Sequence, residues 1–143
     1  LALLKDKDAS KLRAKIVGAH NDEMIVSASN ISENLNENEL KVLKKETSTG
    51  GAKIVKLLGT SAYYAPAAAA VKMCEMIVGK SDEIISASVL IDDELSCGRL
   101  VRLGRDGLKE ILELNLSENE QEQLSKSEAE IRKNIKFLKE NLD

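Results

Sequence analysis

Apolar and polar residues alternate near the start of the chain. Leu12, Ala14 and Ile16 are separated by basic residues and are followed closely by Gly18. This period-two pattern predicts a half-buried strand, because successive side chains of a strand point to opposite faces. His20 would then lie just past the end of that strand.

Helical spacing begins further along, after a capping box formed by Asn36 and Glu39. Apolar residues then recur at intervals of three and four, which predicts a helix over residues 37–58. Gly50 and Gly51 interrupt the pattern, although a glycine inside a helix costs about 1 kcal/mol relative to alanine. The pair therefore indicates either a kink or a close approach of another backbone.

The next stretch is apolar on most helical faces. It predicts a second helix over residues 61–79, and an all-round apolar helix is expected to be buried. Pro66 falls in its first turns, where the missing N–H is least harmful. Residues 84–91 are rich in β-branched side chains and bounded by polar clusters, so they predict a strand.

The last third of the chain combines a turn signal with another capping box. Asp-Gly at 106–107 separates apolar runs over 100–103 and 108–114, a pattern typical of a β-hairpin. Ser117 and Glu120 then begin an amphipathic helix that runs to the C-terminus. Strands grouped in hairpins, with helices not regularly interposed, predict an α+β fold with antiparallel pairing, packed with long helices.

Composition narrows the functional classes. A chain of 143 residues with 43% hydrophobic content is expected to form a single domain. The balance of 21 basic and 24 acidic residues offers no basic stripe for a nucleic-acid partner. Cys74 and Cys97 form no metal or disulfide motif, so no metal site is predicted and a reducing cytoplasm is expected. No apolar run approaches the roughly 20 residues of a membrane span.

His20 is the single histidine and the first candidate for chemistry. Histidine titrates near neutral pH, so one placed at a strand end can take up and return a proton. A loop histidine without a role is the alternative that this residue alone leaves open. No Gly-x-Gly-x-x-Gly follows any predicted strand, so the chain carries no dinucleotide-binding fingerprint.

The surroundings of the histidine add a resemblance. Residues 16–25, Ile-Val-Gly-Ala-His-Asn-Asp-Glu-Met-Ile, resemble the segment around the catalytic histidine of lactate and malate dehydrogenases. That family usually has glycine at Asn21, and threonine or serine at Glu23. Residues 49–67 are similar to the kinked helix pair of bacterial malate dehydrogenases, and 103–117 resemble the family's hairpin and last helix start. The chain is thus similar to the C-terminal, substrate-side domain of this family, of the bacterial lactate-dehydrogenase-like type.

The resemblance implies roles at matching positions only. His20 would be the acid/base that takes the hydroxyl proton of a 2-hydroxy acid while hydride passes to NAD. Thr60 and Ser61 would line the substrate pocket. Met24 would flank the nicotinamide, with core packing as the alternative, and Asp22 would order the turn.

Other parts of the family apparatus are expected upstream of Leu1. These are the aspartate that orients the histidine, the arginine that clamps the substrate carboxylate, the mobile-loop arginines and the NAD-binding Rossmann domain. The start without methionine is taken as a cut through a longer chain, and this piece alone should have negligible turnover. Four arginines within the chain are interpreted as surface residues rather than substitutes: Arg13, Arg99, Arg102 and Arg105.

The implied activity is interconversion of malate and oxaloacetate with NAD, a tricarboxylic acid cycle reaction, in a homo-oligomer that is a dimer or tetramer. The preference for malate rests on residues 63–67, and lactate is the alternative substrate. A second alternative is a catalytically silent domain that serves subunit association. Asn21, Glu23 and two stretches that are shorter than the family pattern, 26–31 and 94–101, support it; either those stretches are true deletions or residues are missing from the chain.

Overall fold

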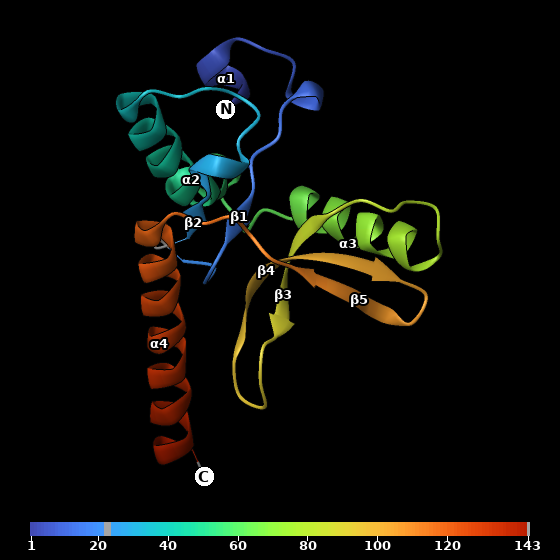
Figure 1. The fold of residues 1–143 in the computed structure, drawn as a ribbon, viewed down its shortest axis with the longest axis vertical. Helices are drawn as coiled ribbons and strands as arrows, with labels where there is room; N and C mark the ends of the chain where they lie inside the picture. The colour runs from blue at the N-terminus through green and yellow to red at the C-terminus, as the bar shows by residue number, and fades with distance from the viewer. Residues whose placement is uncertain (22–23, 143) are drawn as a thin grey trace.

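The computed structural model describes residues 1–21 and 24–142, and shows antiparallel strands flanked by helices (Figure 1). The α-helices are α1 (Ala2–Lys5), α2 (Glu37–Leu58), α3 (Tyr64–Ile77) and α4 (Glu118–Asn141), and short 3-10 turns occur at η1 (Ala9–Lys11) and η2 (Ala28–Asn30). The strands are β1 (Ile16–Val17), β2 (Ile25–Val26), β3 (Ile85–Leu90), β4 (Ser96–Gly104) and β5 (Gly107–Leu112). The predicted α+β class with antiparallel pairing is confirmed.

The strands form two sheets that meet at one point. β3, β4 and β5 form an antiparallel meander with β4 in the centre, and β1 pairs with β2. An isolated bridge between Gly18 and Gly98 connects the two sheets. The predicted hairpin is confirmed, with Arg105 and Asp106 at its turn and Gly107 at a φ of 91°, which favours glycine. β4 begins earlier than predicted, at Ser96, because residues 96–99 pair with the backbone of β3. These four residues have few apolar side chains, so the sequence pattern did not indicate a strand there.

Two clusters of buried apolar side chains lie against β4. One comprises Val17, Ile25 and Leu100, and the other Met76, Val101 and Leu103. Leu100 and Val101 are consecutive, so their side chains point to opposite faces of the strand. β4 therefore separates a core shared with the small sheet and α4 from a core shared with α3.

The two long helices begin where the sequence predicts. The Asn36 side chain accepts a hydrogen bond from the Glu39 N–H at 3.0 Å, and the Glu39 carboxylate accepts one from the Asn36 N–H at 2.9 Å. Ser117 and Glu120 form the same reciprocal pair at the start of α4. Both capping boxes are thus confirmed, and each satisfies N–H groups that a helix start leaves without partners.

The prediction that the second helix is buried was wrong. α3 is shorter than predicted, and Met76 is its one buried residue, contacting the cluster on β4 together with the partly buried Met73. The helix packs along a single face, so the apolar run over residues 67–71 is exposed. A helix that is apolar on all sides can be covered on all sides, but its sequence does not say what covers it. Within the described chain, α3 is covered on one face only, by β4.

The predicted first strand is also shorter than expected. The period-two pattern starts at Leu12, but pairing covers only Ile16 and Val17, because β2 is two residues long and η2 then breaks the ladder. Backbone contact resumes beyond η2, where the Ser32 N–H donates to the Arg13 carbonyl at 2.9 Å. Alternation thus identified an extended segment correctly but not the extent of its pairing.

α2 continues without a break through Gly50 and Gly51. A side chain at either position would meet nothing within 4 Å. The prediction that another backbone segment approaches Gly50 and Gly51 closely is therefore wrong for the described part of this chain. Approach of another domain or subunit stays a prediction.

Candidate functional site

His20 is exposed in the loop between β1 and β2, as the sequence predicts for a residue just past a strand end. The loop borders a cavity of about 710 Å³ that is open to solvent. Met24, on the far side of the loop, lines the same cavity. The structure therefore brings these two candidates together.

The wall of the cavity is mostly apolar and comes from several elements. β1, β3 and β4 provide most of it, with Thr47 from α2 and Ile131 from α4. Cys97, a buried free thiol, also lines it. His20 is the one histidine among the described residues that line the cavity. No lysine, arginine, aspartate or glutamate of the described chain lines the cavity, so these walls provide no clamp for a substrate carboxylate.

Thr60 and Ser61 lie elsewhere. Both are exposed, in the turn between α2 and α3, and neither lines the cavity beside His20. The structure does not bring them together with the histidine. Their role as substrate contacts stays a prediction.

No residue of the described chain forms a hydrogen bond with the His20 imidazole. An acid/base histidine normally has a carboxylate on its second nitrogen, which fixes the tautomer and the orientation of the ring. Asp22, predicted to order the turn, and Glu23 lie outside the described residues. The orienting carboxylate is thus not supplied by residues 1–21 or 24–142.

The backbone leading to His20 is held by β4. The Gly18 N–H donates to the Gly98 carbonyl, and the Gly98 N–H to the Gly18 carbonyl, both at 3.0 Å. Gly18 has a φ of 91°, a conformation that side chains strongly disfavour. A Cβ at Gly98 would lie 2.5 Å from the Gly18 carbonyl oxygen. Both glycines are thus required by a close backbone crossing two residues before the histidine.

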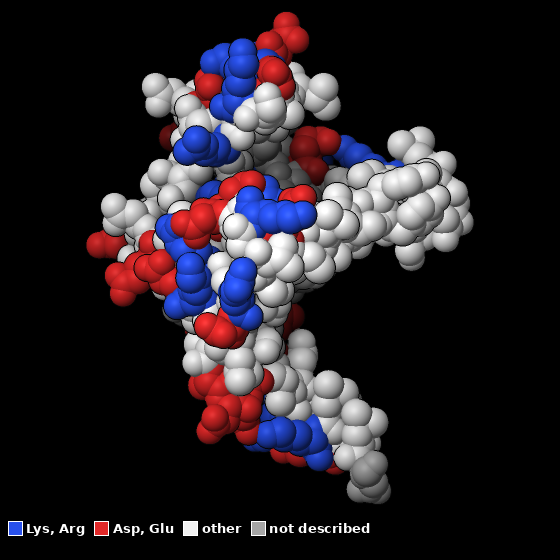
Figure 2. Space-filling model, turned by 90° about the vertical axis from the view of Figure 1, so that its right-hand side faces the viewer, with Lys and Arg blue, Asp and Glu red and all other residues white. Residues whose placement is uncertain are grey.

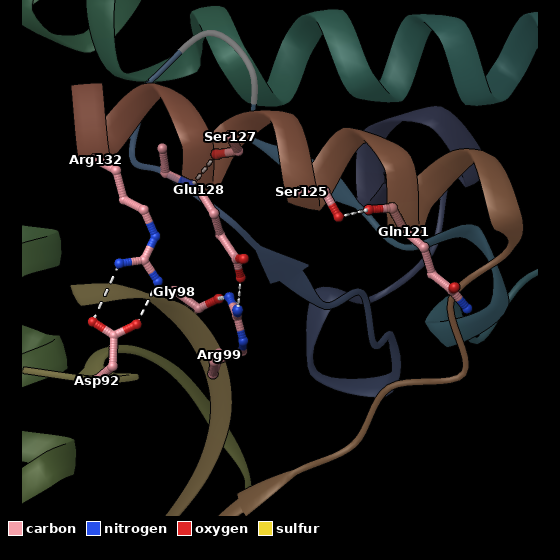
Figure 3. Close-up of polar contacts among 9 residues, drawn as sticks. Asp92, Gly98, Arg99, Gln121, Ser125, Ser127, Glu128 and Arg132 are labelled. Atoms are coloured by element: carbon pink, nitrogen blue, oxygen red, sulfur yellow. Dashed lines mark hydrogen bonds and ion pairs between the residues drawn. The ribbon is translucent and has the colours of Figure 1, made fainter. Parts of the chain in front are cut away.

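A second support comes from α4. Ser127 is 1% exposed, and its Oγ accepts a hydrogen bond from the Ala19 N–H at 3.0 Å (Figure 3). The sequence prediction missed this residue. A signal was present, because Ser127 lies between Leu124 and Ile131 at helical spacing, which places a hydroxyl on the apolar face of the helix. A polar group on such a face needs a hydrogen-bond partner, but the pattern does not identify which one.

Three ion pairs join α4 to the β3–β4 hairpin; we call them the hairpin clamp. They are Arg99 with Glu128, Asp92 with Arg132, and Glu94 with Lys139 (two of them appear in Figure 3). The hydrogen bonds from Arg132 hold the pKa of the Asp92 carboxyl well below its usual range, aided by two backbone N–H donors in the turn. The clamp fixes the hairpin that carries Gly98 against the helix that carries Ser127.

Two of the four arginines considered as substitutes for the missing substrate-binding arginine, Arg99 and Arg102, have other partners. Arg99 pairs with Glu128, and Arg102 pairs with Asp82 at 2.9 Å. Among the described residues, no group of three potential metal ligands occurs, and no helix is long and apolar enough to cross a membrane.

Comparison with known proteins gives one consistent family. The family described as lactate/malate dehydrogenase, alpha/beta C-terminal domain, matches residues 1–142. A probable malate dehydrogenase of Campylobacter jejuni is 41% identical over 130 residues, covering 82% of this chain and 43% of that protein. Since 82% of this chain is fewer than 130 residues, that relative has residues within the match that this chain lacks. The positions of these residues are not known, so the shortened stretches at 26–31 and 94–101 stay a prediction.

Solved structures agree. The malate dehydrogenase of Salinibacter ruber superimposes with a TM-score of 0.89 and 28% identity, over 97% of this chain and 50% of that chain. A lactate dehydrogenase of Cryptosporidium parvum, complexed with lactic acid and nicotinamide adenine dinucleotide, gives a TM-score of 0.89 and 26% identity, over 99% of this chain and 50% of that chain. The chain spans about half the length of these relatives. It belongs to the lactate/malate dehydrogenase family, and it corresponds to the C-terminal domain of that family.

Proposed function

We propose that this chain is the substrate-side domain of an NAD-dependent malate dehydrogenase, in which His20 is the proton acceptor and donor. The observation that carries the proposal is the position of His20. It is an exposed imidazole at the edge of a mostly apolar cavity, on a backbone held from two sides by Gly98 and Ser127. A fixed backbone with an accessible ring suits a group that must meet a substrate in one geometry.

In the proposed reaction, neutral His20 takes the proton of the malate C2 hydroxyl as the C2 hydride leaves, which yields oxaloacetate. In reverse, the imidazolium returns the proton to the oxo oxygen of oxaloacetate. NAD, when bound, would accept the hydride during malate oxidation, and NADH would donate it in the reverse reaction. The described wall of the cavity carries no aspartate or glutamate that would compete with the substrate for the imidazolium proton.

The described residues, 1–21 and 24–142, do not form a site for the whole cofactor. A dinucleotide pyrophosphate is usually bound at a glycine-rich turn before a helix, and the sequence has no such motif. The charge-free lining of the cavity likewise offers nothing to a phosphate. Met24 at the cavity edge is proposed to contact the nicotinamide, and an NAD-binding Rossmann domain is proposed for the rest of the protein. Alone, this chain should have negligible turnover.

Malate is proposed over lactate as the substrate, because the most similar relatives include several named malate dehydrogenases. Thr60 and Ser61 remain the proposed substrate contacts. A cytoplasmic location is proposed as well, and the free cysteines Cys74 and Cys97 fit a reducing compartment.

The test uses the full-length protein, assayed for NADH oxidation with oxaloacetate and with pyruvate. We expect a preference for oxaloacetate and a loss of about 100- to 10,000-fold in kcat for His20→Asn, the range typical of general acid/base groups. Lys133→Asn, at an exposed position of α4, is the matched control and should retain activity. If the His20 variant is as active as the parent protein, His20 is not the acid/base group. If the protein prefers pyruvate to oxaloacetate, its substrate is lactate rather than malate.

A second candidate function is subunit association without catalysis. The observation that favours it is the exposed apolar surface of α3 and the preceding turn, where residues 57–71 carry no charged side chain. Figure 2 shows charges of both signs over much of one face, and a large projecting part of that face without any. A full-length protein that forms a stable oligomer but does not oxidise NADH with either substrate would support this function over the first.

A further inference from the structure

We propose that Ser127 is a positioning residue for His20, acting through the backbone rather than on the substrate. The proposal rests on the proposed function of His20. Ser127 lies on α4, more than 100 residues away along the chain, yet it accepts a hydrogen bond from the N–H of Ala19, the residue immediately before the histidine (Figure 3). Ser127 contacts the backbone and not the imidazole, so its role would be to fix the position of His20.

The geometry makes this hydroxyl the acceptor for the Ala19 N–H. The distance from Ala19 N to Ser127 Oγ is 3.0 Å, within the normal range of a hydrogen bond. Ser127 is 1% exposed, so water does not readily replace its hydroxyl as the acceptor. The hydrogen bond fixes the plane of the Gly18–Ala19 peptide group, so only the φ and ψ rotations of Ala19 separate this fixed plane from the peptide group of His20.

The other arm of this support is Gly98 on β4. Its two hydrogen bonds with Gly18 fix the backbone one residue before Ala19. Arg99 stiffens this arm, since its Nη1 donates to the Gly98 carbonyl at 3.0 Å, the same oxygen that accepts the Gly18 N–H. The pairing of Gly18 with Gly98 of β4 therefore places the Ala19 N–H within hydrogen-bonding distance of Ser127 on α4.

The two arms are tied together beside the contact. Arg99, next to Gly98, forms an ion pair with Glu128, next to Ser127 (Figure 3). The side chain of Arg99 is largely buried, so this ion pair is partly shielded from solvent. A movement of α4 relative to β4 would thus change the backbone just before His20, and the ion pair resists that movement.

Removing the hydroxyl should therefore alter the chemical step without removing a substrate contact. In the full-length protein, we expect Ser127→Ala to lower kcat by about 10- to 100-fold, since small misplacements of a catalytic group have effects of this size. The KM values for oxaloacetate and NADH should change less than about twofold, because Ser127 is not a residue of the cavity lining. Hydrogen exchange in the peptide that contains Ala19, measured by mass spectrometry, should become at least about tenfold faster.

Ser125→Ala is the matched control. Ser125 is on the same helix, is exposed, and donates to the Gln121 carbonyl within the helix at 3.0 Å. This variant should match the parent protein in kcat and in exchange at Ala19. Ser127→Cys leaves no cavity and replaces the hydroxyl by a slightly larger thiol, which is a weaker acceptor. It should show smaller changes in the same direction, so the proposal stays testable even if the alanine variant is unstable.

The outcomes separate this inference from the proposed function. If Ser127→Ala and Ser127→Cys exchange faster at Ala19 but retain full kcat, Ser127 is a structural residue and the proposal is overturned. The same holds if exchange does not change, or if kcat falls equally in Ser125→Ala. If the parent protein does not oxidise NADH, the proposed function fails and the catalytic role of Ser127 fails with it, while the exchange measurement still shows whether Ser127 holds the Ala19 backbone.

Discussion

Glu120 is a buried carboxylate that joins two distant parts of the chain. It is 4% exposed, and one oxygen accepts the Ser117 N–H at 3.0 Å in the capping box of α4. Its other oxygen accepts the N–H of Ala28, the first residue of η2 and two residues past the end of β2, at 2.8 Å. The start of α4 is thereby tied to the strand that follows the His20 loop.

Glu120→Ala should lower the free energy of unfolding by about 1 to 3 kcal/mol. The substitution removes a helix cap and leaves two backbone N–H groups without their charged acceptor. Urea unfolding followed by circular dichroism measures the change. Glu118→Ala, at an exposed first-turn position of the same helix, should cost about 0.5 kcal/mol or less. Equal losses in the two variants would show that the Ala28 contact contributes nothing specific.

At this scale the sequence reveals local partners and not distant ones. The pairing of Ser117 with Glu120 was predictable because a capping box spans three residues. The contact of Glu120 with Ala28 was not, since it joins residues 92 positions apart. His20 follows the same rule: its place past a strand was predictable, whereas Gly98 and Ser127 come from elements that only the tertiary fold brings to it.

At the scale of elements, Asp92 is the best-connected residue of the hairpin clamp. Its carboxylate accepts the N–H groups of Glu94 and Leu95 within the turn, and it pairs with Arg132 of α4. These contacts lower the pKa of Asp92, with the Arg132 hydrogen bonds as the largest cause. The ionised form is therefore stabilised in the folded protein relative to the unfolded chain.

The clamp should make stability depend on pH in acid. A carboxyl whose folded pKa is depressed contributes its full stabilisation above its unfolded pKa, close to 3.8 for Asp92, and loses it as the pH falls towards the folded value. We expect the urea midpoint of the parent to exceed that of Asp92→Asn at pH 7, with a difference that shrinks as the pH falls below about 4. Asp93→Asn, at the exposed neighbouring position, should lower the midpoint little at either pH. A difference for Asp92→Asn that stays constant with pH would refute this role.

The elements also show where helical patterns are informative. The bounds of α2 were predicted from its capping box and its apolar spacing, which are local signals. The structure adds Gly59, which ends the helix at a φ of 69°. The burial of α3 was not predicted correctly, because apolar spacing does not say which surface will cover it. Only Met76 of that helix is buried within this chain.

At the scale of the molecule, the apolar surface left open by α3 is continuous with the end of α2 and the turn between them. Leu57 is 86% exposed, Tyr64 71% and Val71 59%. Scattered apolar residues are common on protein surfaces, but a charge-free run of this length marks a contact surface. The chain spans about half the length of its relatives, so the rest of the protein and a second copy are both candidates to cover it.

We expect the isolated chain to self-associate through this surface, because exposed apolar area is removed from water when two copies pack together. Sedimentation velocity over a range of concentrations should show an oligomer that dissociates on dilution. Leu57→Lys combined with Val71→Lys should shift the chain to monomer, since a buried lysine opposes the contact. Leu3→Lys, at a fully accessible apolar position of α1, should leave the association unchanged. If the chain is monomeric at every concentration, a second copy does not cover α3, and the rest of the protein becomes the candidate to cover it. This result would not affect the catalytic proposal for His20.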